Sequence, residues 1–152
     1  MPDRYVQPNW FTRNVFNRII AGLARLGISV YGSRVLAVRG RKTGTWHTIP
    51  VNLLEHRGER YLVAPRGVTQ WVRNVRAGSE VELRLGARRE RVKLIEIPDG
   101  DPLKIELVRA YLRRWAFEVG VFFEGVDANA SDEALRRIAP NHPVFRIEPQ
   151  RA

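Results

Sequence analysis

The stretch from Ser33 to Pro65, SRVLAVRGRKTGTWHTIPVNLLEHRGERYLVAP, decides the fold that the sequence predicts. Three of its segments, SRVLAVR, HTIPVNLLEH and RYLVAP, are rich in β-branched and other apolar residues. They are separated by GRKTG and by Arg57-Gly58, whose residue types favour tight turns. Because short turns join antiparallel neighbours, the stretch predicts three consecutive antiparallel strands.

Three more segments extend this sheet. EVELRL and RERVKLIEI alternate apolar and charged residues on either side of Gly86-Ala87, which predicts a hairpin with one face in water. HPVFRIE predicts a last strand. Six strands with few helices predict a mainly β protein with α (α+β), in which a small barrel or strongly curled sheet carries the helices on its outside.

Four segments predict helices. Apolar residues recur at helical spacing from Asn9 to Val30, and a shorter helix is expected in TQWVRNVRAG, with Gly78 ending it. Pro102 to Val119 carries a wide apolar stripe. Ser131-Asp132-Glu133 provides an N-cap and an acidic first turn for a last helix.

The length of 152 residues predicts a single domain. We expect an N-terminal amphipathic helix in residues 1–33, a barrel core in residues 34–97, and helices with the last strand in residues 98–152. The chain has no cysteine, no apolar run near the roughly 20 residues of a spanning helix, and no signal-peptide pattern at its start. These features predict a cytoplasmic protein.

The N-terminal helix has two interpretations. Its mixture of Trp10, Phe11 and Phe16 with arginines suits the surface of an anionic membrane, which would make the protein peripheral there. The same helix could equally lie across the barrel with its arginines in water. Both interpretations stay open at the level of sequence.

The net charge of +10 is concentrated in the barrel segment. Between Arg34 and Lys93 there are 14 Arg and Lys against 5 Glu, so this segment carries +9. Such a field attracts anions: nucleic acid, an acidic lipid surface or a multiply charged small molecule. The alternative is an arginine-rich surface that serves solubility alone.

Several kinds of chemistry are excluded by missing motifs. The sequence contains neither GxGxxG, nor a P-loop, nor GxSxG. The three histidines, His47, His56 and His142, lack metal-ligand spacing, so no metal site is predicted. What the sequence does offer is a site made of backbone groups and cations.

GRKTGTWHTIP, residues 40–50, is the candidate for that site. Gly40 and Gly44 tolerate positive φ angles, which would let consecutive N–H groups point at one anion. Arg41 offers a planar fork and Lys42 a point charge, and further hydrogen bonds could come from Thr43, His47 and Thr48. The loop therefore predicts a phosphate site, with a solvated turn as the alternative reading.

A larger pattern surrounds this loop. GRKTG is followed by Pro50, by the hairpin VNLLEHRGERYLVA, by Arg66-Gly67 and by the W-x-x-N of Trp71 and Asn74. In order and spacing, this run from about Arg34 to Leu85 resembles the deazaflavin (coenzyme F420)-dependent nitroreductase family. The resemblance implies a split β-barrel that binds coenzyme F420, some relatives using FMN instead.

The resemblance also assigns roles to residues of this chain. Arg41, Lys42 and Thr43 would hold the coenzyme phosphate, with Gly44 shaping the loop. Ala64, Pro65, Arg66 and Gly67 would lie against the deazaflavin ring and present backbone donors, and Trp71 and Asn74 would close the pocket. The anionic tail of the coenzyme would have four candidate partners: Arg57, Arg60, Arg73 and Arg76.

The activity implied is hydride transfer from the reduced coenzyme to a small hydrophobic acceptor, namely a quinone, a nitroaromatic compound or an enone. Tyr111 is the candidate proton donor, although Tyr111 and Trp115, four residues apart on one helical face, are more typical of core packing. The sequence departs from the family in Trp46-His47, where the family commonly has Pro-Arg, and in the loop before Trp71. Substrate residues are therefore not transferred.

Other readings stay open beside this enzyme. A non-catalytic barrel that carries FMN, another flavin, haem or lipid is the main rival. A basic barrel that stacks single-stranded nucleic acid on Trp46, Tyr61 and Trp71 is more remote, because these aromatics do not alternate on one strand face. The sequence also leaves open whether two barrels pair as a homodimer.

Overall fold

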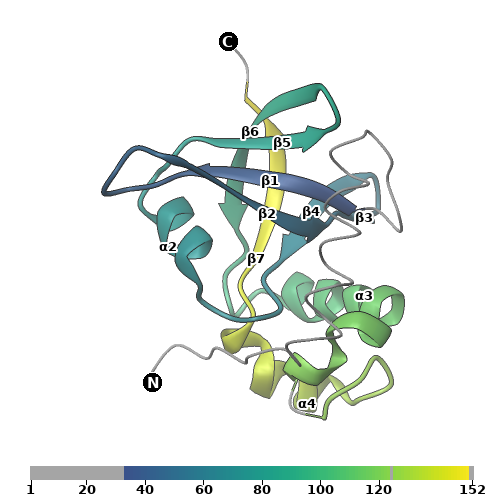
Figure 1. The fold of residues 1–152 in the computed structure, drawn as a ribbon. Coiled ribbons are helices and arrows are strands. Elements are labelled where there is room, and N and C mark those ends of the chain that lie inside the picture. Colours follow the sequence, from purple (N-terminus) through teal and green to yellow (C-terminus); the bar gives the residue numbers. More distant parts are fainter. Residues whose placement is uncertain (1–32, 124, 151–152) are drawn as a thin grey trace.

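The computed structural model describes residues 33–123 and 125–150. Seven strands form one antiparallel sheet in the order β2-β1-β5-β6-β7-β4-β3. The strands are β1 (Ser33–Arg39), β2 (Trp46–Asn52), β3 (Leu54–His56), β4 (Glu59–Val63), β5 (Val81–Leu85), β6 (Arg88–Glu96) and β7 (Val144–Pro149). The sheet curls into a half-barrel, as Figure 1 shows.

The curl follows from the connection between the two outermost strands. β2 and β3 stand at opposite ends of the strand order, yet only Leu53 separates them in the chain. The ends of the sheet are therefore drawn together. The prediction of six strands was wrong in this one respect, because HTIPVNLLEH divides at Leu53 where pairing changes from β1 to β4.

The last strand lies in the middle of the sheet, between β6 and β4. Its Ile147 belongs to the barrel core, together with Leu36, Val38, Leu62 and Leu83. The described part of the chain thus needs its C-terminal strand to complete the barrel. This placement also brings the residues just before β7 close to the end of β4.

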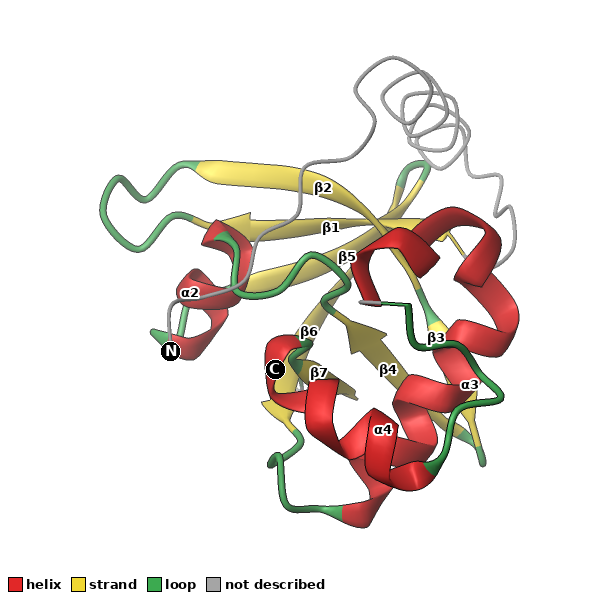
Figure 2. Ribbon diagram, turned by 90° about the horizontal axis from the view of Figure 1, so that it is seen from below, coloured by secondary structure: helices red, strands yellow, loops and turns green. Residues whose placement is uncertain are grey.

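In the described part of the chain, three helices lie outside the sheet: α2 (Gln70–Arg76), α3 (Pro102–Val119) and α4 (Asp132–Ile138). Two 3-10 turns, η1 (Gly120–Phe123) and η2 (Ala139–Asn141), follow α3 and α4. α2 lies near the β1–β2 end of the half-barrel, whereas α3 and α4 pack together away from it (Figures 1 and 2). A second core surrounds Trp115 and Phe123 between α3, α4 and the sheet.

Local predictions for these elements are confirmed. Ser131 caps α4, its Oγ accepting a hydrogen bond of 3.1 Å from the N–H of Ala134. The two-residue turn Gly86-Ala87 joins β5 to β6, with Leu85 opposite Arg88 and φ of 61° at Gly86. The predicted helix at residues 9–30 lies outside the described residues. Within the described part, none of the helices has the length and apolar character needed to cross a membrane.

Candidate functional site

The loop between β1 and β2 is closed by its own backbone. The N–H of Gly40 donates to Thr45 O at 2.7 Å, and the N–H of Gly44 donates to Gly40 O at 2.9 Å. Gly44 has the predicted positive φ, 74°, but Gly40 does not. Gly40 is required for a different reason: a Cβ there would approach Thr43 Oγ1 to 2.9 Å and Thr45 O to 3.2 Å.

Two adjacent N–H groups of this loop, those of Lys42 and Thr43, have no acceptor among the described residues. The neighbouring donors are engaged, because Arg41 N–H bonds Asn74 and Thr45 N–H bonds Thr43 Oγ1 at 3.2 Å. The Lys42 side chain is exposed and has no ion-pair partner in the described part of the chain. The tip of the loop therefore presents two N–H donors and one ammonium group to solvent.

Arg41 is held against α2 by neutral amides. Its backbone N–H and its Nη1 both donate to Asn74 Oδ1, at 3.2 and 2.7 Å, and Nη1 also donates to Gln70 Oε1 at 2.9 Å. Asn74 is buried, with 5% of its surface exposed. The guanidinium is thus held by neutral partners, and no carboxylate of residues 33–123 or 125–150 pairs with it. Gln70 was missed by the sequence analysis, because only the fold reveals that it and Asn74 share one helical face toward Arg41.

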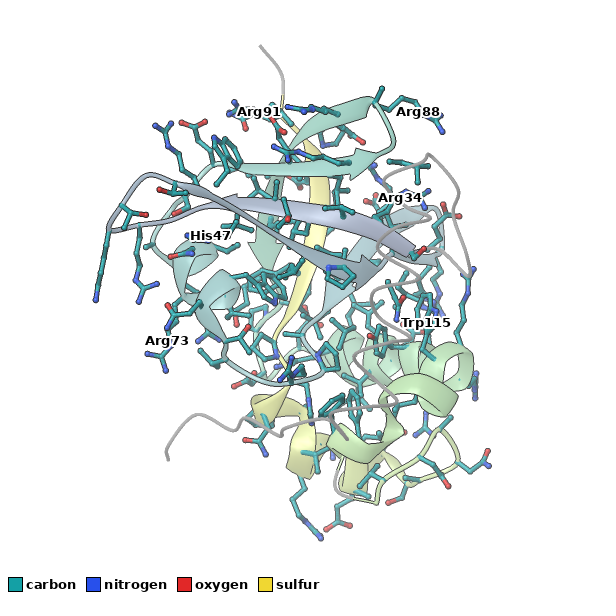
Figure 3. All side chains as sticks on the ribbon, viewed as in Figure 1. Arg34, His47, Arg73, Arg88, Arg91 and Trp115 are labelled. Carbon is teal, nitrogen blue, oxygen red and sulfur yellow. The ribbon has the colours of Figure 1, made fainter. Side chains whose placement is uncertain are left out.

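β2 distributes the other predicted residues over two faces of the sheet. His47 pairs with Val38, whose side chain belongs to the barrel core, whereas Thr48 and Pro50 pair with Ala37 and Val35 on the opposite face. His47 lies against the loop, since a Cβ on Gly40 would be 3.3 Å from its Nε2. Figure 3 shows it near α2. Thr48 and Pro50 therefore do not share a face with His47.

The segment that joins β4 to α2 turns at Gly67, which is buried with φ of 86°. Most of its backbone donors are already used: Ala64 N–H bonds Pro143 O at 2.8 Å, Gly67 N–H bonds Ala64 O at 3.2 Å, and Pro65 has none. Val68 N–H has no acceptor among the described residues. A ligand lying on this segment would thus meet fewer free donors than the sequence suggested.

Trp71, Asn74 and Tyr111 each have an internal partner. Trp71 is half-buried and its ring lies 5.6 Å from that of Phe145. Asn74 contacts Arg41, as described above. Tyr111 is only 2% exposed, packs against Trp115 at 4.9 Å between ring centres, and accepts a weak hydrogen bond from Asn52 Nδ2 at 3.5 Å. These contacts fit the packing interpretation of Tyr111 and Trp115.

Three of the four arginines predicted to bind the coenzyme tail are paired with carboxylates. Arg57 bonds Glu106 at 2.8 Å. Arg60 bonds Glu90 through two contacts of 2.8 Å, and Arg76 bonds Glu96 at 2.7 and 2.9 Å. Arg73 lies exposed on α2 (Figure 3). The charge of the first three is therefore largely compensated within the chain.

The pKa shifts at the barrel reflect these pairs. Hydrogen bonds from Arg60 lower the pKa of Glu90, against the effect of partial burial, and the same pair raises the pKa of Arg60. Hydrogen bonds from Arg91 lower the pKa of Glu80. Burial, and then the nearby charge of Arg88, lowers the pKa of Arg34.

The histidines have separate structural surroundings. His142 is fully buried and bonds Pro65 O through Nδ1 at 3.0 Å, and His56 Nε2 lies 3.5 Å from Glu106. His47 lies at the loop. Across residues 33–123 and 125–150, no group of three or more His, Asp or Glu side chains is placed to hold a metal ion.

The chain is similar to known proteins in sequence and in fold. A family model described as F420H(2)-dependent quinone reductase matches residues 12–125. No curated protein matches the sequence. Among solved structures, an F420-H2-dependent reductase (FDR-A) superposes with a TM-score of 0.51 at 17% identity, covering 77% of this chain and 94% of that one.

Two further structures share the fold. HutZ, the haem storage protein from Vibrio cholerae, superposes with a TM-score of 0.53 at 10% identity, covering 80% of this chain and 84% of that one. Atu2129, a protein of unknown function from Agrobacterium tumefaciens str. C58, gives 0.50 at 16% identity, covering 98% of this chain. This chain spans 58% of the length of Atu2129. At these identities the likeness establishes the split half-barrel fold alone.

Proposed function

This chain belongs to the F420H(2)-dependent quinone reductase family, and from that premise we propose that it transfers a hydride from the reduced coenzyme to a quinone. The family name supports the deazaflavin-dependent oxidoreductase class and coenzyme F420, both predicted from the sequence. The quinone as the acceptor of this chain is our proposal. Nitroaromatic compounds and enones stay predictions.

The proposal is supported most directly by the donor groups at the tip of the β1–β2 loop. Free N–H groups on Lys42 and Thr43, the Lys42 ammonium and the amide-held guanidinium of Arg41 are the donors that a phosphate diester requires. Arg41 bonds Gln70 at the start of α2, and His47 lies against the same loop at Gly40. We assign the coenzyme phosphate to this loop.

The ring is assigned to the Pro65–Gly67 turn. Ala64 and Gly67 are buried, whereas Pro65 and Arg66 are partly exposed, so the ring would lie on Pro65 and Arg66. Gln70, Trp71 and Asn74 follow on α2, so the same segment continues toward Arg41. One continuous stretch, residues 64–74, would thus contact both the ring and the phosphate-binding arginine.

When bound, the coenzyme supplies the hydride. Reduction of a quinone to a quinol adds that hydride and one proton, and negative charge develops on the quinone oxygen during transfer. Hydrogen-bond donors close to the ring would stabilise this charge, most strongly where the site excludes water. We assign the proton to solvent, because the hydroxyl of Tyr111 is buried in the second core.

The proposal is tested by binding and turnover with the full chain. Purified protein is titrated with oxidised coenzyme F420 and separately with FMN at two salt concentrations, followed by ligand fluorescence. Oxidation of the reduced coenzyme is then measured with a soluble quinone and with a nitroaromatic compound. We expect salt-sensitive binding of F420, weaker binding of FMN, and quinone-dependent oxidation.

Each alternative gives a different result. Binding of F420 without turnover of any acceptor would favour the non-catalytic carrier. Absence of F420 binding would overturn the proposal and leave GRKTG as a turn. Homodimer formation and membrane association through residues 1–33 are separate predictions that rest on the sequence.

A further inference from the structure

The pairing of β4 with β7 ends at two prolines. The register pairs Val63 with Val144, so its continuation places Ala64 opposite Pro143 and Pro65 opposite His142. Ala64 N–H still donates to Pro143 O at 2.8 Å. Because proline has no N–H, Pro143 cannot return the reciprocal bond to Ala64 O, and the ladder stops there.

Both carbonyls at this end find other donors. Ala64 O accepts from the N–H of Gly67 at 3.2 Å, which turns the chain away from the sheet. Pro65 O contacts Nδ1 of His142 at 3.0 Å. A carbonyl oxygen can only accept, so Nδ1 must carry the proton in this contact. The turn is thus closed by one backbone bond and one side-chain bond.

The imidazole is held in orientation by its surroundings. His142 is fully buried, and its ring stacks on that of Phe123 with centres 4.1 Å apart and planes at 20°. Phe123 is itself fully buried in the second core. From the same turn, the Arg66 guanidinium lies over the ring of Phe122, 5.9 Å from its centre. η1 therefore contacts both the histidine and the turn that the histidine bonds.

From these contacts we propose that His142 is a positioning residue for the Pro65–Gly67 turn, and so for the angle at which the coenzyme ring faces its acceptor. The inference rests on the proposed function, since it takes the turn to be the ring-binding segment. His142 lies 77 residues from Pro65 in the sequence, and its bond reaches the segment assigned to the ring, not the loop assigned to the phosphate. Its loss should therefore alter hydride transfer more than phosphate binding.

The test compares two substitutions of His142. His142→Asn places an amide N–H where Nδ1 lies, whereas His142→Phe keeps a ring to stack on Phe123 but has no donor. We expect His142→Phe to lower the hydride-transfer rate on the order of tenfold or more, because small displacements of reacting atoms are costly. The dissociation constant for F420 should change by less than about threefold. His142→Asn should retain most of the rate.

Several results would overturn the inference. Equal rates for His142→Phe and the unmodified chain would do so. Equal losses in both variants would also do so, because the amide donor of His142→Asn would then fail to rescue the rate. Circular dichroism and thermal unfolding check that each variant folds. If His142→Phe does not fold, nitrogen NMR of the unmodified protein tests the bond directly. An imidazole that is protonated only on Nε2 cannot donate from Nδ1 to Pro65 O, so that tautomer would overturn the inference. Failure of the unmodified chain to bind F420 would refute the proposed function while leaving this NMR result informative.

Discussion

Two groups of arginines on the barrel are held in opposite ways. At the β1–β2 loop, Arg41 is fixed by the neutral amides of Asn74 and Gln70. On the outer face around Trp46, Arg84 and Arg91 are fixed by the carboxylates of Glu80 and Glu82 and lie 5.8 and 5.3 Å from the indole centre. Within the described residues, the second group has carboxylate partners, whereas Arg41 has only neutral ones.

This difference shows that the anion-binding capacity of an arginine depends on whether its partner is a carboxylate or an amide. A carboxylate partner orients a guanidinium and weakens its field, so we expect the face around Trp46 to contribute more to the fold than to anion binding. An amide partner orients the guanidinium and leaves the field for a ligand. Net charge alone cannot distinguish these cases, since both groups count equally toward the +10.

The largest effect should come from removing the amide-held group. Arg41→Ala/Lys42→Ala deletes two charged donors to the coenzyme phosphate, each worth about 1.5–3 kcal/mol. We expect the affinity for F420 to fall by about a hundredfold or more at low salt, with a weaker salt dependence than in the unmodified protein. Fluorescence titration at two salt concentrations measures both quantities.

Its matched control is Arg84→Ala/Arg91→Ala, which removes the same formal charge from the carboxylate-held group. We expect this pair to change F420 affinity by less than about threefold. Equal losses in the two double variants would show that the coenzyme responds to net charge alone. The contrast between the two groups would then have no functional meaning.

A smaller and sharper effect is expected from Asn74→Asp. This nearly isosteric change keeps the two hydrogen bonds from Arg41 but turns the amide partner into a carboxylate. Arg41 is then held as Arg84 and Arg91 are. We expect F420 affinity to fall by about tenfold, which is about 1.4 kcal/mol, with no loss of thermal stability.

Asn129→Asp provides the control for Asn74→Asp, because Asn129 is exposed on the loop before α4 and the net charge changes equally. We expect it to bind F420 normally. An unchanged affinity in Asn74→Asp itself would mean that the charge of Arg41 does not reach the coenzyme.

The smallest effect concerns stability rather than binding. Hydrogen bonds from Arg60 lower the pKa of Glu90 from its ordinary value of 4.5, so the pair stabilises the fold fully above that value. This contribution is lost as the pH falls through the folded-state pKa. Because both side chains are partly exposed, we expect about 0.5–1 kcal/mol.

Urea unfolding near neutral pH and in acid measures this contribution for Glu90→Gln, Arg60→Gln and the double variant. The coupling should be present at neutral pH and absent in acid, with F420 affinity unchanged throughout. A coupling that persists after Glu90 is protonated would contradict the assigned origin of the pKa shift.

The sequence predicted the local elements well because their signals are local. Alternation of apolar and charged residues predicted the hairpin at Gly86-Ala87, and apolar residues at helical spacing predicted α3. Ser131 predicted the start of α4. The β strand predicted across residues 47–56 was too long, since nothing in its composition indicates that its two halves pair with different strands. The GRKTG motif located the loop but attributed a positive φ to Gly40 that only Gly44 adopts.

By itself, then, the sequence determined the strands, the helices of the described region and a basic loop with a family resemblance, because periodicity, turn chemistry and motif spacing act over a few residues. Tertiary structure alone decided which partner each arginine meets and where the C-terminal strand enters the sheet. It also decided that His142 bonds Pro65. These pairings join residues far apart in the chain, and they depend on strand register and burial, which no local pattern specifies.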